Sequence, residues 1–310
     1  MSLETDLLLD RRRLKRRLSF WRVLAVLSIS AALGLVAWRG AVPGGAPHVS
    51  RLTVSGFITG DRKLERAIAK LADDKSSKAL LVYIDSAGGS VAGGEGLHDV
   101  IARVAKRKPV VAVMGGIAAS AGYMVAAPAE RIFAREATLT GSIGVLLDAP
   151  EISGLLQKIG INNEVLVSGP LKAQPSFTAP ISPEGRQVLQ ALVMDLYDQF
   201  VAIVAAGRHM DAARVRELAD GRPYSGRQAL RLGLVDQIGG ETDAREWLAQ
   251  TKGVSADLPV HEVTESGLAE RLFVGGISGT LAALVKSVLS QGLMIDGAWA
   301  VWQPRLHVTE

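Results

Sequence analysis

Apolar and polar positions alternate in blocks along the middle of the chain, and the block lengths predict strands and helices in turn. Unbroken apolar runs are typical of buried strands, whereas apolar residues three or four apart are typical of helices with one buried face. Strands are expected at 49–58, 78–85, 109–116, 130–134 and 162–169, with helices at 61–74, 91–108, 121–129 and 151–160 between them.

From residue 182 onward the apolar spacing is helical. Helices are expected at 182–208, 211–220, 225–233 and 240–250. Strands that alternate with helices predict an α/β fold with a mainly parallel sheet and crossover helices. The predicted domain covers 49–251 and a helical extension covers 252–310. Within the extension, the apolar stretch 266–292 suits a membrane surface, a partner subunit or the face of the domain itself.

Residues 20–38, FWRVLAVLSISAALGLVAW, predict a transmembrane helix. The 19 residues would span roughly 28 Å as a helix, close to the hydrocarbon thickness of a bilayer. The preceding segment 1–19 is basic, which places the N-terminus in the cytoplasm and the rest of the chain outside. A cleaved signal peptide is the alternative, although the run is longer than a usual signal core. Residues 39–48, rich in glycine and proline, predict a tether.

The charge of the chain is concentrated at its start. The 310 residues carry a net charge of +4, and residues 1–22 hold seven basic against three acidic residues, which accounts for all of it. The remaining chain is neutral. A basic arm that binds nucleic acid is one interpretation of residues 1–22, but the apolar span that follows argues against it, and no nucleic-acid partner is expected. At 48% hydrophobic and 21% charged the composition is that of a folded protein, and the absence of cysteine excludes disulfides and cysteine metal sites. No metal or cofactor is predicted.

Two stretches at the carboxyl ends of predicted strands are candidates for a site, because ligands bind there in α/β sheets. YIDSAGGSVAGGEG, residues 83–96, is a glycine-rich loop whose amides suit an anion or a developing oxyanion, but it lacks the spacing of a nucleotide-binding loop. GGIAASAGYMVA, residues 115–126, places Ser120 alone among small residues at a strand-to-helix junction, which suits an exposed nucleophile. A close-packed helix start with no catalytic role would use the same residues.

A serine nucleophile needs a base, and the histidines are poorly placed to serve. No histidine lies between His98 and His209, and His209 has no acidic partner in a site loop, so a Ser-His-Asp triad is not supported. A lysine base must be neutral, which requires apolar surroundings that lower its pKa. The segment SGPLKAQPSFTAP, residues 168–180, offers such surroundings to Lys172, although most loop lysines are simply solvated.

Read in order, DSAGGS, GGIAASAGYMVAAPA, TLTGSIGV and SGPLKAQPS resemble the signal peptide peptidase A family of membrane-anchored serine proteases. GRPYSGRQALRLGLVDQIGG, residues 221–240, is also similar to that family. The resemblance extends over residues 49–251 and implies a Clp protease/crotonase-like fold, with repeated ββα units around a parallel sheet. Ala87 and Ala121 stand where the family often has proline and glycine.

The resemblance implies roles for residues by their positions in these motifs. Ser120 matches the nucleophile, Lys172 the general base, and Ser142 a serine that orients the lysine amine. The implied reaction is that of a serine endopeptidase, in which the serine is acylated and water then releases the acyl group. The oxyanion hole would be formed by the backbone amides of Gly88, Gly89 and Ala121.

The resemblance also implies partners and a location. Family members with one catalytic domain form homo-oligomeric rings or domes, in which neighbouring subunits complete the active sites. Their substrates are hydrophobic peptides, the signal-peptide remnants left in the membrane. The expected location is the bacterial inner membrane, with a single span and the catalytic domain on the periplasmic side. Two alternatives stay open: a crotonase-like acyl-CoA enzyme without a nucleophile, and a non-catalytic membrane-bound oligomeric scaffold.

Overall fold

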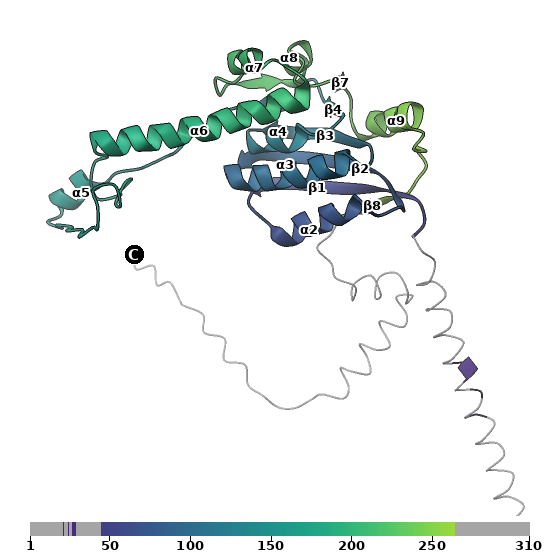
Figure 1. Cartoon of the computed structure of the whole chain (residues 1–310), viewed down its shortest axis with the longest axis horizontal. Coiled ribbons are helices and arrows are strands. Elements are labelled where there is room, and N and C mark those ends of the chain that lie inside the picture. The colour runs from purple at the N-terminus through teal and green to yellow at the C-terminus, as the bar shows by residue number, and fades with distance from the viewer. Residues whose placement is uncertain (1–20, 22–23, 25–26, 29–44, 264–310) are drawn as a thin grey trace, which may run out of the picture. The chain divides into compact units, whose positions relative to one another are not determined.

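The structure is a computed structural model that describes residues 45–263 and, nearer the N-terminus, positions 21, 24, 27 and 28. The predicted cytoplasmic segment 1–19, most of the predicted transmembrane helix and residues 264–310 of the predicted extension lie outside the described residues. Between residues 45 and 263 the chain forms a mixed sheet with helices packed against it (Figure 1).

One sheet, mostly parallel, contains the strands of this region. They are β1 (His48–Ile58), β2 (Ser77–Gly89), β3 (Val110–Ala119), β4 (Arg131–Ala134), β5 (Leu139–Gly141), β6 (Pro223–Ser225), β7 (Gln237–Ile238) and β8 (Val260–Glu262). The order across the sheet is β6-β5-β3-β2-β1-β8, and β4 pairs with β3 and β7 beside this path. β5 and β6 are antiparallel and the other pairs are parallel.

The helices begin where the sequence supplies caps. They are α2 (Arg62–Leu71), α3 (Val91–Ala105), α4 (Ala121–Ala126), α5 (Ser153–Lys158), α6 (Pro183–Arg208), α7 (Ala212–Leu218), α8 (Gly226–Arg231) and α9 (Glu241–Lys252). Asp61, Ser90 and Ser182 each accept a hydrogen bond from a first-turn amide of α2, α3 and α6. Pro183 starts α6, where a missing N–H costs nothing.

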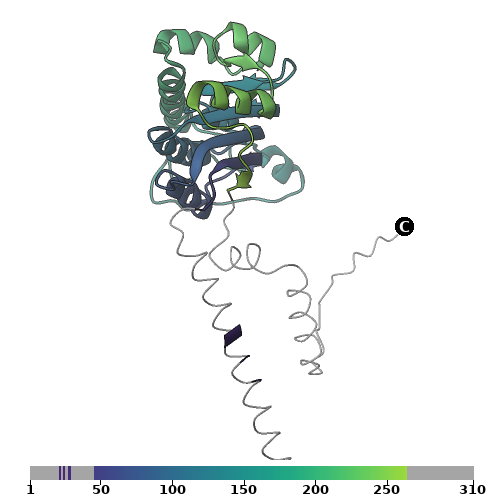
Figure 2. The same ribbon diagram turned by 90° about the vertical axis from the view of Figure 1, so that its right-hand side faces the viewer.

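The two faces of the sheet bury different sets of side chains. α2, α3 and α4 lie over one face, where Val82 and Ile84 of β2 join the larger core (Figure 2). α9 packs against the other face, where Leu81 is buried and Tyr83 is partly buried. Because successive side chains of a strand point to opposite faces, Asp85 follows Tyr83 on the α9 face. It lies where β2 approaches its carboxyl end.

Most predicted elements are confirmed, but the strand predicted at 162–169 is wrong. This segment makes no strand pairing, and its Val165 and Leu166 are 53% and 90% exposed. A strand needs a neighbour for its backbone groups, and the segment lies with α5 beyond the N-terminal end of α6, away from the sheet (Figure 1). The short strands β5, β6, β7 and β8 were not predicted, because two or three residues are too few to show a periodicity.

α6 has 26 residues, which makes it about 39 Å long, and only part of it joins the core. Its buried apolar side chains, Phe200, Val201 and Val204, lie in its C-terminal third, whereas Val188 and Leu192 are exposed. Within the described ranges, α6 is the helix with the length and apolar composition of a membrane span. The burial of Phe200, Val201 and Val204 is also typical of a helix that packs in the core of a domain.

Candidate active site

Ser120 is the single residue between β3 and α4, at the junction that the sequence predicts. Its backbone angles, φ 54° and ψ −123°, fall where residues other than glycine are rarely found. The Ser120 amide donates to the Gly141 carbonyl at 2.8 Å, and all of α4 behind it is buried. A strained turn on a rigid support therefore presents the Ser120 hydroxyl, which caps no helix amide, at the carboxyl edge of the sheet.

Tyr123 shows how firmly α4 is held. Its ring is fully buried, and its hydroxyl donates to the Leu234 carbonyl at 2.8 Å. Burial raises the pKa of Tyr123 well above its usual value, so the phenol stays neutral. Tyr123 is therefore an anchor for the helix behind Ser120 and not a base for it.

The glycine loop at the end of β2 lies directly against Ser120. Gly88 has φ +122°, and a Cβ at this position would come within 2.9 Å of Ser120 Cβ and 3.2 Å of its Oγ. A Cβ at Gly89 would lie 2.0 Å from the Ile58 carbonyl oxygen. Both positions therefore require glycine. A side chain at Gly88 would fill the space in front of the Ser120 hydroxyl. The Gly88 amide donates to Ser86 Oγ at 3.1 Å.

Ser142 lies next to Ser120 because of strand pairing. Ala119 of β3 is the register partner of Gly141 of β5, so the residues that follow them, Ser120 and Ser142, leave the sheet side by side. Ser142 also has a positive φ, 48°, and its amide donates to the Arg222 carbonyl at 3.0 Å. Two serines in strained backbone thus meet at one edge of the sheet.

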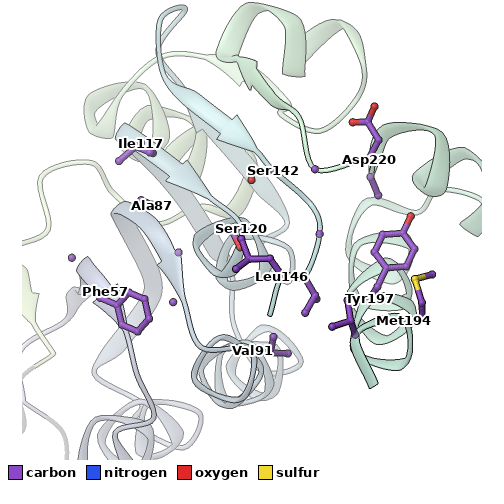
Figure 3. Close-up of a pocket in the computed structure, with 18 of the residues that line it drawn as sticks. Phe57, Ala87, Val91, Ile117, Ser120, Ser142, Leu146, Met194, Tyr197 and Asp220 are labelled. Carbon is purple, nitrogen blue, oxygen red and sulfur yellow. The ribbon is translucent and has the colours of Figure 1, made fainter. Parts of the chain in front are cut away.

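A cavity of about 1010 Å³ opens in front of Ser120. Figure 3 shows Ser120 between Phe57 on one side and Tyr197 and Met194 of α6 on the other. The lining residues are mainly apolar or small: Gly56, Phe57, Asp85, Ala87, Gly88, Gly89, Val91, Ile117, Ser120, Ser142, Gly144, Val145, Leu146, Gln190, Val193, Met194, Tyr197, Ala219, Asp220 and Gly221. The described residues contribute no lysine, arginine or histidine to this lining.

The predicted base does not line this cavity. Lys172 is exposed on the segment 146–182, here called the arm, which includes α5 and joins the N-terminal end of α6. Gln174 accepts a hydrogen bond from the Ser182 amide at 3.4 Å, so this part of the arm is close to the start of α6. Along the axis of α6, Ser182 is roughly 12 Å from Gln190, the first residue of this helix that lines the cavity.

The structure thus brings together most of the predicted site. Gly88, Gly89, Ser120 and Ser142 line one cavity, and Ala121 follows Ser120 as the first residue of α4. Other lining residues were not predicted. Asp85 had a signal, because it precedes the glycine loop at the carboxyl end of a buried strand. The residues of α6 that line the cavity had no such signal in the sequence. No local pattern predicts which side of a long helix contacts a distant loop.

Comparison with known proteins agrees with this geometry. The profile of peptidase family S49 matches residues 102–255, and the profile of Clp protease matches residues 60–143. A Synechocystis sp. protein described as a protease is 42% identical over 210 residues, which are 67% of this chain and 76% of that protein. An Enterococcus faecium protein described as signal peptide peptidase SppA is 41% identical over 60% of this chain, and a Methanocaldococcus jannaschii protein described as a protease is 38% identical over 67%.

The chain spans 54% and 66% of the lengths of the last two relatives. The Clp protease match covers α2 to β5, so the sheet that carries Ser120 has a Clp protease-like fold. The same matches favour a peptidase over the acyl-CoA enzyme and the scaffold, which the sequence motifs had left open. The chain belongs to peptidase family S49 and is a serine-type peptidase.

Proposed function

We propose that the chain is an endopeptidase that uses Ser120 as nucleophile and Lys172 as general base. The observation that carries the proposal is the strained junction that holds Ser120 at a cavity, directly against Gly88. Lys172 Nζ accepts the hydroxyl proton as Ser120 Oγ attacks the scissile carbonyl, and the proton then passes to the leaving amine. Lys172 Nζ, neutral again, then deprotonates the water that hydrolyses the acyl-enzyme.

The oxyanion is proposed to bind the amides on either side of the Ser120 hydroxyl. The Ala121 amide is the first in α4 and has no acceptor within the helix. The Gly88 amide donates to Ser86 Oγ, so an oxyanion would replace Ser86 Oγ as its acceptor or share the amide with it, with the Gly89 amide beside it. The Ser142 hydroxyl lines the same cavity and would orient the incoming lysine amine.

A neighbouring copy of the chain is proposed to bring Lys172 to the cavity. The arm that bears Lys172 exposes many apolar side chains, a pattern typical of a surface that binds a partner. They are Leu146, Leu147, Ile152, Leu155, Ile159, Ile161, Val165, Leu166, Val167, Leu171 and Phe177. In a homo-oligomeric ring, an arm that packs on the next subunit would cover these side chains and complete that subunit's site.

The substrate is proposed to be an apolar peptide such as a signal-peptide remnant. The cavity offers Phe57, Val91, Ile117, Val193 and Met194 to apolar side chains. The span predicted at residues 20–38 would hold the site at the bacterial inner membrane, on the periplasmic side. The name of the Enterococcus faecium relative supports this substrate class.

The substrate class is tested with the full chain, purified in detergent, and two synthetic peptides. One is a signal peptide with a leucine-rich core, and the other has those leucines replaced by serines. We expect kcat/KM to be at least about tenfold higher for the apolar peptide, because each buried leucine contributes roughly 1.5–3 kcal/mol. Equal rates for the two peptides would contradict the proposed class.

A further inference from the structure

Among the described residues, the two charged side chains that line the cavity are both acidic, and one of them is neutralised by a described cation. Asp220 accepts hydrogen bonds from Arg222 Nε at 2.9 Å and 2.7 Å, one to each carboxylate oxygen. These bonds lower the pKa of Asp220. The carboxylate of Asp85 accepts one hydrogen bond, from the Ile117 amide at 3.1 Å, and no basic side chain within the described ranges pairs with it. The uncompensated charge of the cavity is therefore that of Asp85.

The position of Asp85 follows from a break in strand register. Ile84 is paired with Met114 and Ser86 with Ala118, so Asp85 lies opposite three residues of β3. Within this bulge, Asp85 Oδ1 accepts a hydrogen bond from the Ile117 amide. The side chain is exposed on the α9 face of the sheet, so its second oxygen remains available to a ligand in the cavity.

An aromatic ring lies on the neighbouring strand. Phe57 is 75% exposed, although large aromatic side chains are normally buried. A register shift between Ser55 and Phe57, with Gly56 at φ +69°, turns this residue out of the core and onto the rim of the cavity (Figure 3). Ser55 is the register partner of Asp85 and Phe57 that of Gly88, so ring and carboxylate lie on adjacent strands at the same edge.

An exposed aromatic ring beside an unpaired carboxylate is the combination that binds a lysine or arginine side chain. The apolar stem and the cation pack on the ring, and the charged end pairs with the carboxylate. We propose that Phe57 and Asp85 form a subsite for a basic side chain of the peptide substrate, within a few residues of the scissile bond. The proximity follows from Gly88, which pairs with Phe57 and at which a Cβ would come within 2.9 Å of Ser120 Cβ. This inference rests on the proposed peptidase function and narrows its substrates to apolar peptides that carry a nearby basic residue.

The proposal is tested by measuring how much the full chain, purified in detergent, prefers lysine to norleucine. A series of apolar peptides carries lysine, or its neutral counterpart norleucine, at one position at a time around the cleaved bond. We expect one position at which lysine raises kcat/KM about fivefold, as for a partly exposed ion pair. In Asp85→Asn, which keeps an oxygen for the Ile117 amide, this ratio should fall to about one. In Asp220→Asn, the matched acid that already has a cation, the ratio should stay at its wild-type value.

A second measurement needs no variant. The lysine preference of the wild-type enzyme should disappear in about 1 M NaCl, because salt screens an exposed pair. A lysine ratio that is the same in wild type and Asp85→Asn would overturn the subsite. If Asp85→Asn lowers kcat/KM equally for both peptides of each pair, the ratio is unchanged, and Asp85 would act on the catalytic lysine instead of on the substrate. If the wild type hydrolyses none of the peptides, the proposed endopeptidase function on apolar peptides fails together with the subsite.

Discussion

Replacing Ser120 with alanine is expected to lower kcat/KM for peptide hydrolysis by at least roughly 10⁴-fold, with the fold intact. The reason is that removing the nucleophile abolishes the acyl-enzyme route and leaves only the binding and oxyanion contributions. Stability should change little, because the Ser120 hydroxyl caps no helix and the strained backbone is held by the buried α4. The measurement is steady-state hydrolysis of an apolar peptide, together with the melting temperature of each protein.

A matched control separates this loss from the general effect of removing a serine. Ser255→Ala lies in the loop after α9, outside the cavity lining, and should retain wild-type turnover. Ser120→Ala with more than about one tenth of the wild-type rate would contradict the assignment of the nucleophile.

Replacing Lys172 with alanine should lower kcat/KM by roughly 10²- to 10⁴-fold, the usual contribution of a general base. The arrangement proposed for the oligomer adds a sharper expectation for mixtures. Ser120→Ala chains keep Lys172, and Lys172→Ala chains keep Ser120, so a mixed ring contains some complete sites. Equal amounts, unfolded and reassembled together, should recover about a quarter of the wild-type rate if Lys172 comes from the neighbouring copy.

The control for this mixture is Ser120→Ala reassembled with the double variant that lacks both residues, which should stay inactive. Subunit exchange is checked with tagged chains. If exchange occurs and activity does not return, the base belongs to the same chain as its serine or is not Lys172. Recovery would also explain why Lys172 does not line the cavity of its own chain.

The position of Ser120 could be predicted because the features that create it are local. The apolar run before it is long enough to show a buried strand, and the glycines and alanines around it leave a tight turn as the simplest path. The same holds for β1, β2 and the capped helices α2 and α3, whose signals lie within about ten residues. The sheet around the site therefore matches the sequence-based prediction closely.

The rest of the site depends on contacts between distant segments, which no local pattern encodes. The exposure of Asp85 depends on a register jump against β3, and Phe57 lies at the rim because of a bulge in β1. Tyr197 reaches the cavity only because α6 crosses the domain. The strand predicted at 162–169 failed for the same reason: its apolar residues fit a strand, but the fold places no described strand beside them.

The most direct test of the central claim is to find which residue becomes covalently attached during the reaction. The full chain, purified in detergent, is treated with a fluorophosphonate, which phosphonylates activated serines, and the adduct is located by peptide mass spectrometry. The expected result is a single adduct on Ser120, absent from Lys172→Ala. An adduct on Ser142, which shares the cavity, or full hydrolytic activity after Ser120 has been modified would contradict it.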